Sequence, residues 1–177
     1  MGTEHQSRLA FHIDHGVAVL SANTALVAHL SPDSDDLSGY DTGTREGIMQ
    51  AARDFDAYAA ALEKLGYIVR RIEHSSEDCV RSRFSMNMNV YRNLTMSAQT
   101  AMFPVYPGEY VADATAPLTE ANLRGKALET YRAIRDAGGV PIPIRDPMNR
   151  HNPLRGSIHC ITQILAEREV SEKVLPA

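Results

Sequence analysis

A thiol near one end of the chain and an imidazole near the other are the groups best suited to chemistry. Cys160 follows a glycine-containing stretch and enters an apolar segment, whereas Cys79 lies in a polar stretch and is interpreted as incidental. A cysteine acts as a nucleophile only where a partner deprotonates it or stabilises its thiolate. His159 adjoins Cys160 but would point to the opposite face of a strand, so a base must come from elsewhere. A buried structural cysteine is the alternative interpretation of Cys160.

His12 and Asp14 offer such a base. In an extended segment, side chains two residues apart project from the same face, so His12 and Asp14 would form one polar pair. Alternatively, His12 and Asp14 are simply exposed polar residues at the start of a strand, because so short a motif is common in proteins. The pair gains meaning only if it meets Cys160 across a cavity.

The composition restricts the classes of partner. The chain has 177 residues, with 18 Lys and Arg against 22 Asp and Glu, and a net charge of −4. No global basic field favours nucleic acid, and no apolar run is long enough to cross a bilayer. The first ten residues lack the apolar core of a signal peptide, so we expect a cytoplasmic protein without a membrane partner. Phosphate-binding glycine motifs and zinc-ligand spacings are absent, so we expect no cofactor and no metal.

The elements that position these residues begin with a strand, strand, helix, strand unit. Runs rich in β-forming residues, Gly16–Leu20 and Ala25–Leu30, flank a turn-forming tetrapeptide and predict a hairpin. Apolar residues from Ile48 to Leu62 recur at helical spacing and predict a helix that ends at Gly66. The run 67–72 predicts the strand that completes the unit.

The same order returns in the second half. The sequence predicts strands at 89–96 and 100–106, a helix at 119–137 and a strand at 140–144. Gly66 and Gly139 are 73 residues apart, and so are the strand starts Val17 and Val90, as two copies of one unit require.

We therefore predict an α/β (α+β) chain that forms a single domain, 1–177. It would contain ββαβ modules at 11–73 and 89–145, and a closing strand at 156–165 that carries the cysteine. One such module cannot bury both faces of its small sheet, so two modules suggest an incomplete ring or arc.

Two motifs together resemble a known group of enzymes. The H-I-D of residues 12–14 and the I-H-C-I-T-Q of residues 158–163, with Asn93 between them, resemble the C-terminal half of the guanidine-modifying enzymes, or penteins. The most similar branch contains agmatine deiminase and bacterial peptidylarginine deiminase. That family's fold is a ring of ββαβ modules, so the resemblance implies a partial α/β-propeller (pentein) fold.

The resemblance also implies roles for individual residues. Cys160 matches the nucleophile, His12 the general acid and base, Asp14 a carboxylate that binds the substrate guanidinium, and Asn93 a further substrate contact. A planar guanidinium presents two parallel N–H groups to a carboxylate, which holds its carbon in front of a thiolate. Arg155, in the loop before the cysteine, is a candidate to bind an anionic group of the substrate, with a solvated surface arginine as the alternative.

Three functions remain open on this basis. The first is hydrolytic deimination of a small guanidino substrate such as agmatine or arginine, or of peptidyl arginine, with release of ammonia. The second is an amidinotransferase with the same constellation, and the third is a non-catalytic half-ring that assembles with partners. A further guanidinium-binding aspartate of the family has no counterpart before Phe11, which suggests a homo-oligomer or a complementing N-terminal half.

Overall fold

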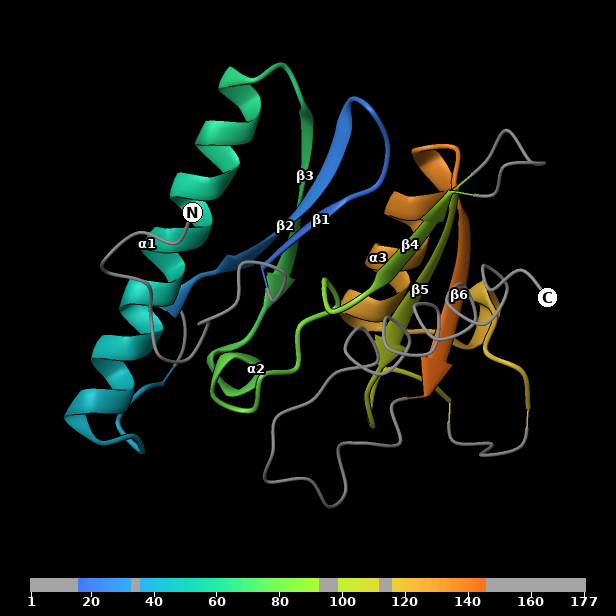
Figure 1. Cartoon of the computed structure of the whole chain (residues 1–177). Coiled ribbons are helices and arrows are strands. Elements are labelled where there is room, and N and C mark those ends of the chain that lie inside the picture. The colour runs from blue at the N-terminus through green and yellow to red at the C-terminus, as the bar shows by residue number, and fades with distance from the viewer. Residues whose placement is uncertain (1–15, 33–35, 93–98, 112–115, 146–177) are drawn as a thin grey trace, which may run out of the picture.

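A computed structural model of the chain describes residues 16–32, 36–92, 99–111 and 116–145 (Figure 1). These residues form a mixed α+β fold with two three-stranded sheets, ordered β1-β2-β3 and β4-β5-β6. The elements are β1 (Val17–Val19), β2 (Thr24–Leu30), α1 (Thr42–Lys64), β3 (Ile68–His74), α2 (Ser76–Val80), β4 (Asn89–Arg92), β5 (Gln99–Val105), η3 (Glu120–Asn122), α3 (Gly125–Asp136) and β6 (Val140–Arg145).

Each sheet has the same internal pattern. β1 pairs antiparallel with β2, which pairs parallel with β3 through the crossover helix α1. In the second unit, β4 pairs antiparallel with β5, which pairs parallel with β6 through α3. The predicted repetition of strand, strand, helix, strand is therefore confirmed in the order and pairing of the elements.

The ends of α1 have local causes that the sequence shows. Asp41 caps the first turn by accepting a hydrogen bond from the Thr44 backbone N–H at 2.9 Å. At the other end Gly66 has a φ of 88°, a left-handed conformation that favours glycine. Gly138 has a φ of 80° at the corresponding end of α3. The equivalent of Gly66 is thus Gly138, and the predicted match to Gly139 is wrong by one residue.

The predicted helix at 119–137 is also wrong in its first part. Glu120–Asn122 form a short 3₁₀ turn, and α3 begins only at Gly125. Between them Leu123 forms a β-bridge with Tyr110, and the Arg124 N–H donates to the Glu109 carbonyl at 2.7 Å. Backbone pairing with the preceding loop therefore keeps this stretch extended, although its apolar spacing is helical.

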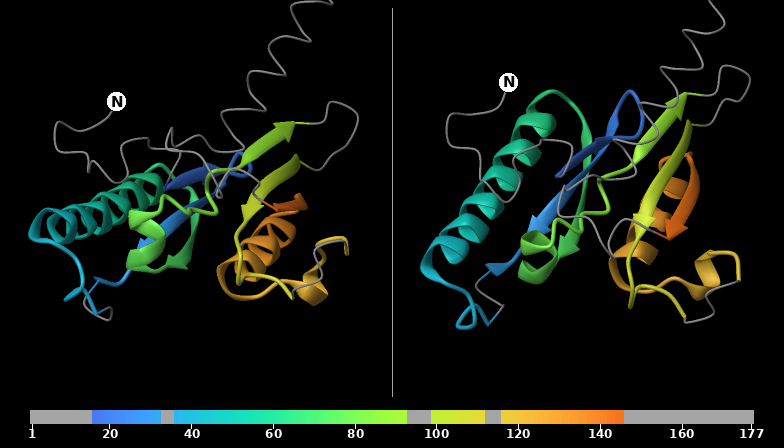
Figure 2. Two further views of the ribbon diagram at one scale, coloured as in Figure 1. Left: turned by 90° about the horizontal axis from the view of Figure 1, so that it is seen from below. Right: turned by 60° about the horizontal axis from the view of Figure 1, so that its bottom comes forward.

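One hydrophobic core runs through both units. Its buried members come from both sheets, from α1 and α3, and from the segment that joins the units. Phe84, in that joining segment, meets Phe55 of α1 edge to face at 5.4 Å between ring centroids. Figure 2 shows α1 along one side of the molecule, the first sheet beside it and the second unit beyond that sheet.

The closing strand predicted at 156–165 lies outside the described residues. Within the described part of the chain, no helix is long and apolar enough to span a membrane.

Candidate functional site

All five residues predicted for the site lie outside the described residues. They are Cys160, His12, Asp14, Asn93 and Arg155. The described backbone does place the strands next to two of these positions: β1 begins at Val17, shortly after Asp14, and β4 ends at Arg92, directly before Asn93.

The described residues contain a different concentration of charge, a cluster built on Lys126. Its Nζ lies 2.7 Å from Oδ1 of Asp78 and also forms an ion pair with Oε1 of Glu109. The three side chains are 10%, 15% and 11% exposed for Lys126, Asp78 and Glu109, respectively. Because Lys126 lies on α3 and Asp78 on α2, this Lys126 cluster ties the second unit to the segment that follows the first.

Local backbone structure orients both carboxylates. Asp78 is the third residue of α2, and its Oδ2 accepts the Ser75 backbone N–H at 3.1 Å while Ser75 Oγ accepts the Asp78 N–H. Glu109 accepts the Tyr106 backbone N–H on Oε2 at 2.9 Å. Each carboxylate therefore keeps its other oxygen for Lys126, whose Nζ also lies 5.3 Å from the Tyr106 ring centroid.

The two carboxylates respond differently to this environment. Burial favours the protonated form of Asp78, but the hydrogen bond and charge of Lys126 bring its pKa below the usual value. Burial dominates at Glu109 and raises the pKa of its carboxyl, although Lys126 is adjacent. Lys126 therefore lies between two carboxylates whose pKa values are shifted in opposite directions.

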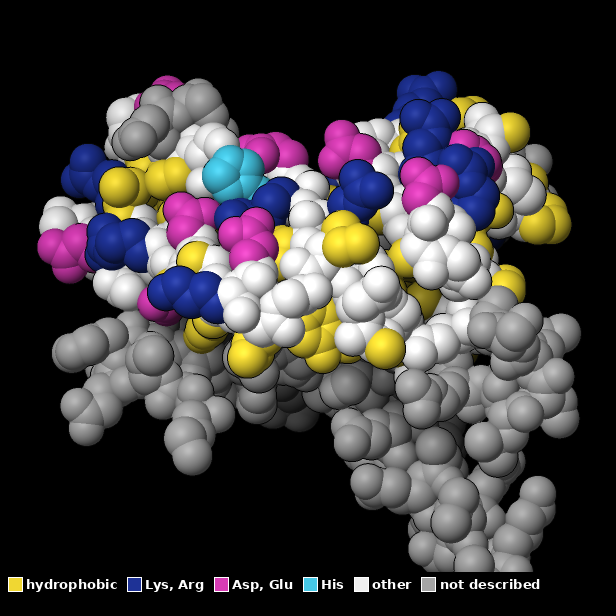
Figure 3. Space-filling view, turned by 90° about the horizontal axis from the view of Figure 1, so that it is seen from above, with side chains coloured by type: hydrophobic (Ala, Val, Ile, Leu, Met, Phe, Trp, Pro, Cys, Tyr) yellow, Lys and Arg dark blue, Asp and Glu magenta, His cyan; other side chains and the backbone are white. Residues whose placement is uncertain are grey.

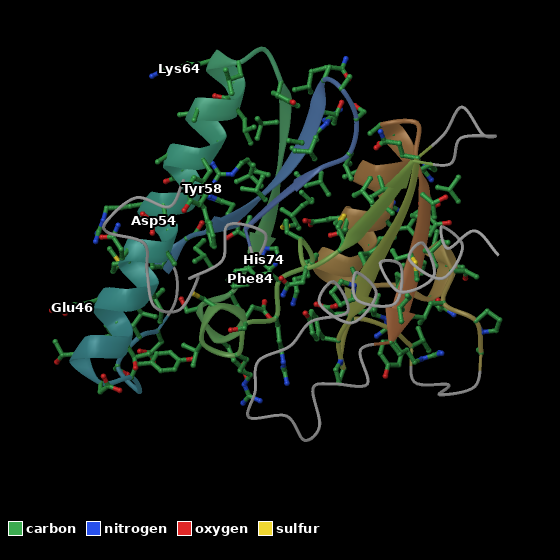
Figure 4. The ribbon with its side chains drawn as sticks, viewed as in Figure 1. Glu46, Asp54, Tyr58, Lys64, His74 and Phe84 are labelled. Carbon is green, nitrogen blue, oxygen red and sulfur yellow. The ribbon has the colours of Figure 1, made fainter. Side chains whose placement is uncertain are left out.

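His74, at the end of β3, is buried beside the cluster. Its Nδ1 lies 2.8 Å from the Ile72 carbonyl and its Nε2 accepts the Ser85 backbone N–H at 3.1 Å. This pattern assigns the proton of the neutral ring to Nδ1. Figure 4 shows His74 next to Phe84, whose ring centroid is 5.3 Å away. With both nitrogens engaged, His74 has no free position for proton transfer.

Burial and, to a smaller extent, the charge of Lys126 lower the pKa of His74 to about 4, against the opposing effects of the Ile72 carbonyl and Asp78. Below pH 6.5, the ordinary pKa of histidine, His74 is protonated in the unfolded chain, whereas in the folded chain it stays neutral until about pH 4. We therefore expect stability to fall by about 3 kcal/mol as the pH decreases from 6.5 to 4, with no contribution from His74 above that window.

This pH dependence is measurable by urea unfolding across that range. His74→Gln should flatten the dependence relative to the wild type, because it removes the group that titrates in this range. The slope must be compared with that of His74→Gln, because the raised pKa of Glu109 makes stability increase as the pH falls, opposite to the effect of His74. An unchanged slope in His74→Gln would contradict the assignment.

Cys79, predicted to lie incidentally in a polar stretch, is on α2 and fully buried. Burial, with a smaller contribution from the charge of Asp78, raises the pKa of its thiol to about 12. The thiol is therefore protonated at neutral pH and is not a nucleophile. Of the two cysteines in the sequence, this leaves Cys160 as the candidate.

A shallow groove between the two units carries charges of both signs. Its walls are formed by β3, with Arg70, Arg71 and Ile72, and by α3, with Glu129, Arg132, Ala133 and Asp136. Arg71 already donates to Asp56 of α1 at 2.7 Å. Figure 3, seen from above, shows acidic and basic side chains on both sides of the notch between the units. Charges of both signs around this groove do not favour an ionic ligand of either sign.

The Lys126 cluster was not predicted from the sequence. Ser75 and Asp78 carry a capping-box pattern that predicts a helix start there, but no local signal links that start to Glu109 or Lys126. Among the described residues, no group of three or more His, Cys, Asp or Glu side chains is arranged to hold a metal ion.

Comparison with known proteins adds no relative. No protein-family model matches the chain, and neither does any curated protein or solved structure.

Proposed function

We propose that the chain is a hydrolytic deiminase of a guanidino substrate, either a small one such as agmatine or arginine, or peptidyl arginine. The observation that carries the proposal is the joint occurrence of H-I-D at 12–14 and I-H-C-I-T-Q at 158–163. Either motif alone is weak, but together they supply a nucleophile, a base and a guanidinium-binding carboxylate.

The state of the described cysteine supports part of this assignment. Cys79 is protonated and buried, so it does not compete for the role of nucleophile. Cys160 is therefore the proposed nucleophile by motif and by elimination, and His12 is the proposed acid–base residue by motif.

The direction of the described strands is compatible with the proposed meeting of the two motifs. β1 begins opposite Val27, the middle residue of β2, and runs antiparallel toward the N-terminal end of that strand. β3 and β6 run the same way in Figure 1, each parallel to the strand before it. The start of β1, which follows the first motif, and the end of β6, which precedes the second motif, thus lie toward corresponding ends of the two sheets. The repeated ββαβ order likewise supports the proposed partial propeller.

In the proposed reaction, the Cys160 thiolate attacks the guanidinium carbon while Asp14 holds the N–H groups. The bond from that carbon to a terminal nitrogen breaks, His12 protonates the leaving nitrogen, and ammonia departs, which leaves an amidino-thioether on the sulfur. Water then attacks the same carbon with His12 as base. The C–S bond breaks, and the ureido product and the free thiolate are released. Asn93 and Arg155 are proposed substrate contacts.

The purified chain, assayed with agmatine, arginine and an arginyl peptide over a range of protein concentrations, tests the proposal. We expect ammonia and a ureido product in equal amounts without any amine acceptor. If an amidino product forms only when an amine acceptor is present, the chain is an amidinotransferase and not a hydrolytic deiminase. Absence of both products at every concentration would overturn the enzymatic proposal and leave a non-catalytic assembly unit.

A further inference from the structure

The segment that joins α2 to β4 is buried but polar. All five residues from 84 to 88 are at most 4% exposed. Within this segment, Oγ of Ser85 and Oδ1 of Asn87 are buried without a hydrogen-bond partner, and so is Nε of Arg83, directly before it. Buried polar atoms in proteins are nearly always paired. Three unpaired atoms at positions 83, 85 and 87 therefore indicate that this segment binds a polar ligand.

The backbone of the segment is held in place by hydrogen bonds. The Ser85 N–H donates to Nε2 of His74 at 3.1 Å, and the Asn87 N–H donates to the Phe84 carbonyl at 3.2 Å. The side-chain Nδ2 of Asn87 donates to the Ser82 carbonyl at 3.5 Å, which leaves Oδ1 as the unused acceptor of that amide. A fixed frame of this kind is what a binding site needs to be selective.

The segment leads into the second sheet as the H-I-D motif leads into the first. Val19 of β1 and Val90 of β4 are equivalent, because each pairs with an alanine whose other partner lies three residues after the glycine that ends the helix. Counted back from these two valines, Ser85 corresponds to Asp14. The second unit thus has polar side chains at the position where the first unit carries the proposed guanidinium-binding carboxylate.

The three unpaired atoms match the two charged groups of a free amino acid. Nε–H of Arg83 and the hydroxyl of Ser85 are donors suited to a carboxylate, and Oδ1 of Asn87 is an acceptor suited to an ammonium group. Arg83 is only half-buried, so the segment is open to a ligand at that end. Of the substrates named above, only free arginine has both groups, because agmatine lacks the carboxylate and an internal arginyl residue has neither.

We propose that Arg83, Ser85 and Asn87 bind the α-carboxylate and α-ammonium groups of free arginine and so select it over agmatine and peptidyl arginine. The inference rests on the proposed deiminase activity and narrows its three substrates to one. The guanidino end of the same molecule is left for Asp14 and Cys160.

The ratio of kcat/KM for arginine to that for agmatine tests this assignment in the full chain. We expect the wild type to prefer arginine at least about tenfold, since a charge-assisted hydrogen bond to the carboxylate is lost with agmatine. Arg83→Gln and Ser85→Ala should each raise KM for arginine about tenfold and leave KM for agmatine within about twofold of the wild type. Arg81→Gln is the matched control, because Arg81 is exposed and already pairs with Glu77, and its ratio should equal that of the wild type.

Urea unfolding separates a binding role from a structural one. The Ser85 hydroxyl has no partner in the fold, so Ser85→Ala should be as stable as the wild type or more stable. A clear loss of stability in Ser85→Ala would contradict the proposal, because the hydroxyl would then already be paired.

The substrate assay distinguishes failure of this inference from failure of the proposed function. A wild type that turns over agmatine or an arginyl peptide as well as arginine would overturn the inference and leave the deiminase proposal standing. A preference for arginine that Arg83→Gln does not reduce would also overturn it, because another residue, such as Arg155, would then bind the carboxylate. A wild type that turns over none of the three would overturn the proposed function and this inference together.

Discussion

Replacement of Cys160 by alanine is expected to abolish ammonia release from every guanidino substrate that the wild type turns over, by at least about 10³-fold in kcat. Alanine cannot form the bond to the guanidinium carbon, and without the amidino-thioether no other route of comparable rate exists in the proposed reaction. The measurement is ammonia production at saturating substrate, with folding checked by circular dichroism.

Cys79→Ala is the matched control. Its thiol is buried and protonated, so its removal should cost about 1–2 kcal/mol of unfolding free energy and leave kcat within about twofold of the wild type. A thiol-alkylating reagent should label the wild type and Cys79→Ala at one site under native conditions, and should not label Cys160→Ala. Turnover retained in Cys160→Ala would exclude Cys160 as the nucleophile.

The order of elements could be predicted from the sequence because its signals are local. Two runs of β-forming residues between Val17 and Leu30 flank a turn-forming tetrapeptide, and this pattern predicts the observed hairpin. Gly66 adopts the left-handed conformation at the end of α1. The start of α3 could not be predicted in this way, since the bridge between Tyr110 and Leu123 is a tertiary contact. Periodicity in that stretch agrees with a helix, and backbone pairing overrides it.

The buried charges show a second limit of local reasoning. Lys126 resembles any lysine near the start of an exposed helix, and Glu109 resembles any glutamate in a turn. Their burial depends on tertiary contacts of α2 and α3, and residue spacing in the sequence does not predict such contacts. The equivalence of β6 with β3, by contrast, follows from the repeat once its register is corrected to Gly138. A shift of one residue moves every side chain of a strand to the other face, so the correction decides which residues of β6 correspond to those of β3.

The pairing of Lys126 also predicts a large effect on stability. Lys126→Ala should lower the free energy of unfolding by about 3–5 kcal/mol, because it leaves the buried carboxylates of Asp78 and Glu109 side by side without their cation. Lys64→Ala, at the exposed end of α1, should change it by no more than about 0.5 kcal/mol. Urea unfolding at pH 7 compares the two variants. Adding Asp78→Asn and Glu109→Gln to Lys126→Ala removes the uncompensated charge and should recover part of the loss. A loss below about 1 kcal/mol in Lys126→Ala would show that water reaches the carboxylates, and that the cluster does not hold the two units together.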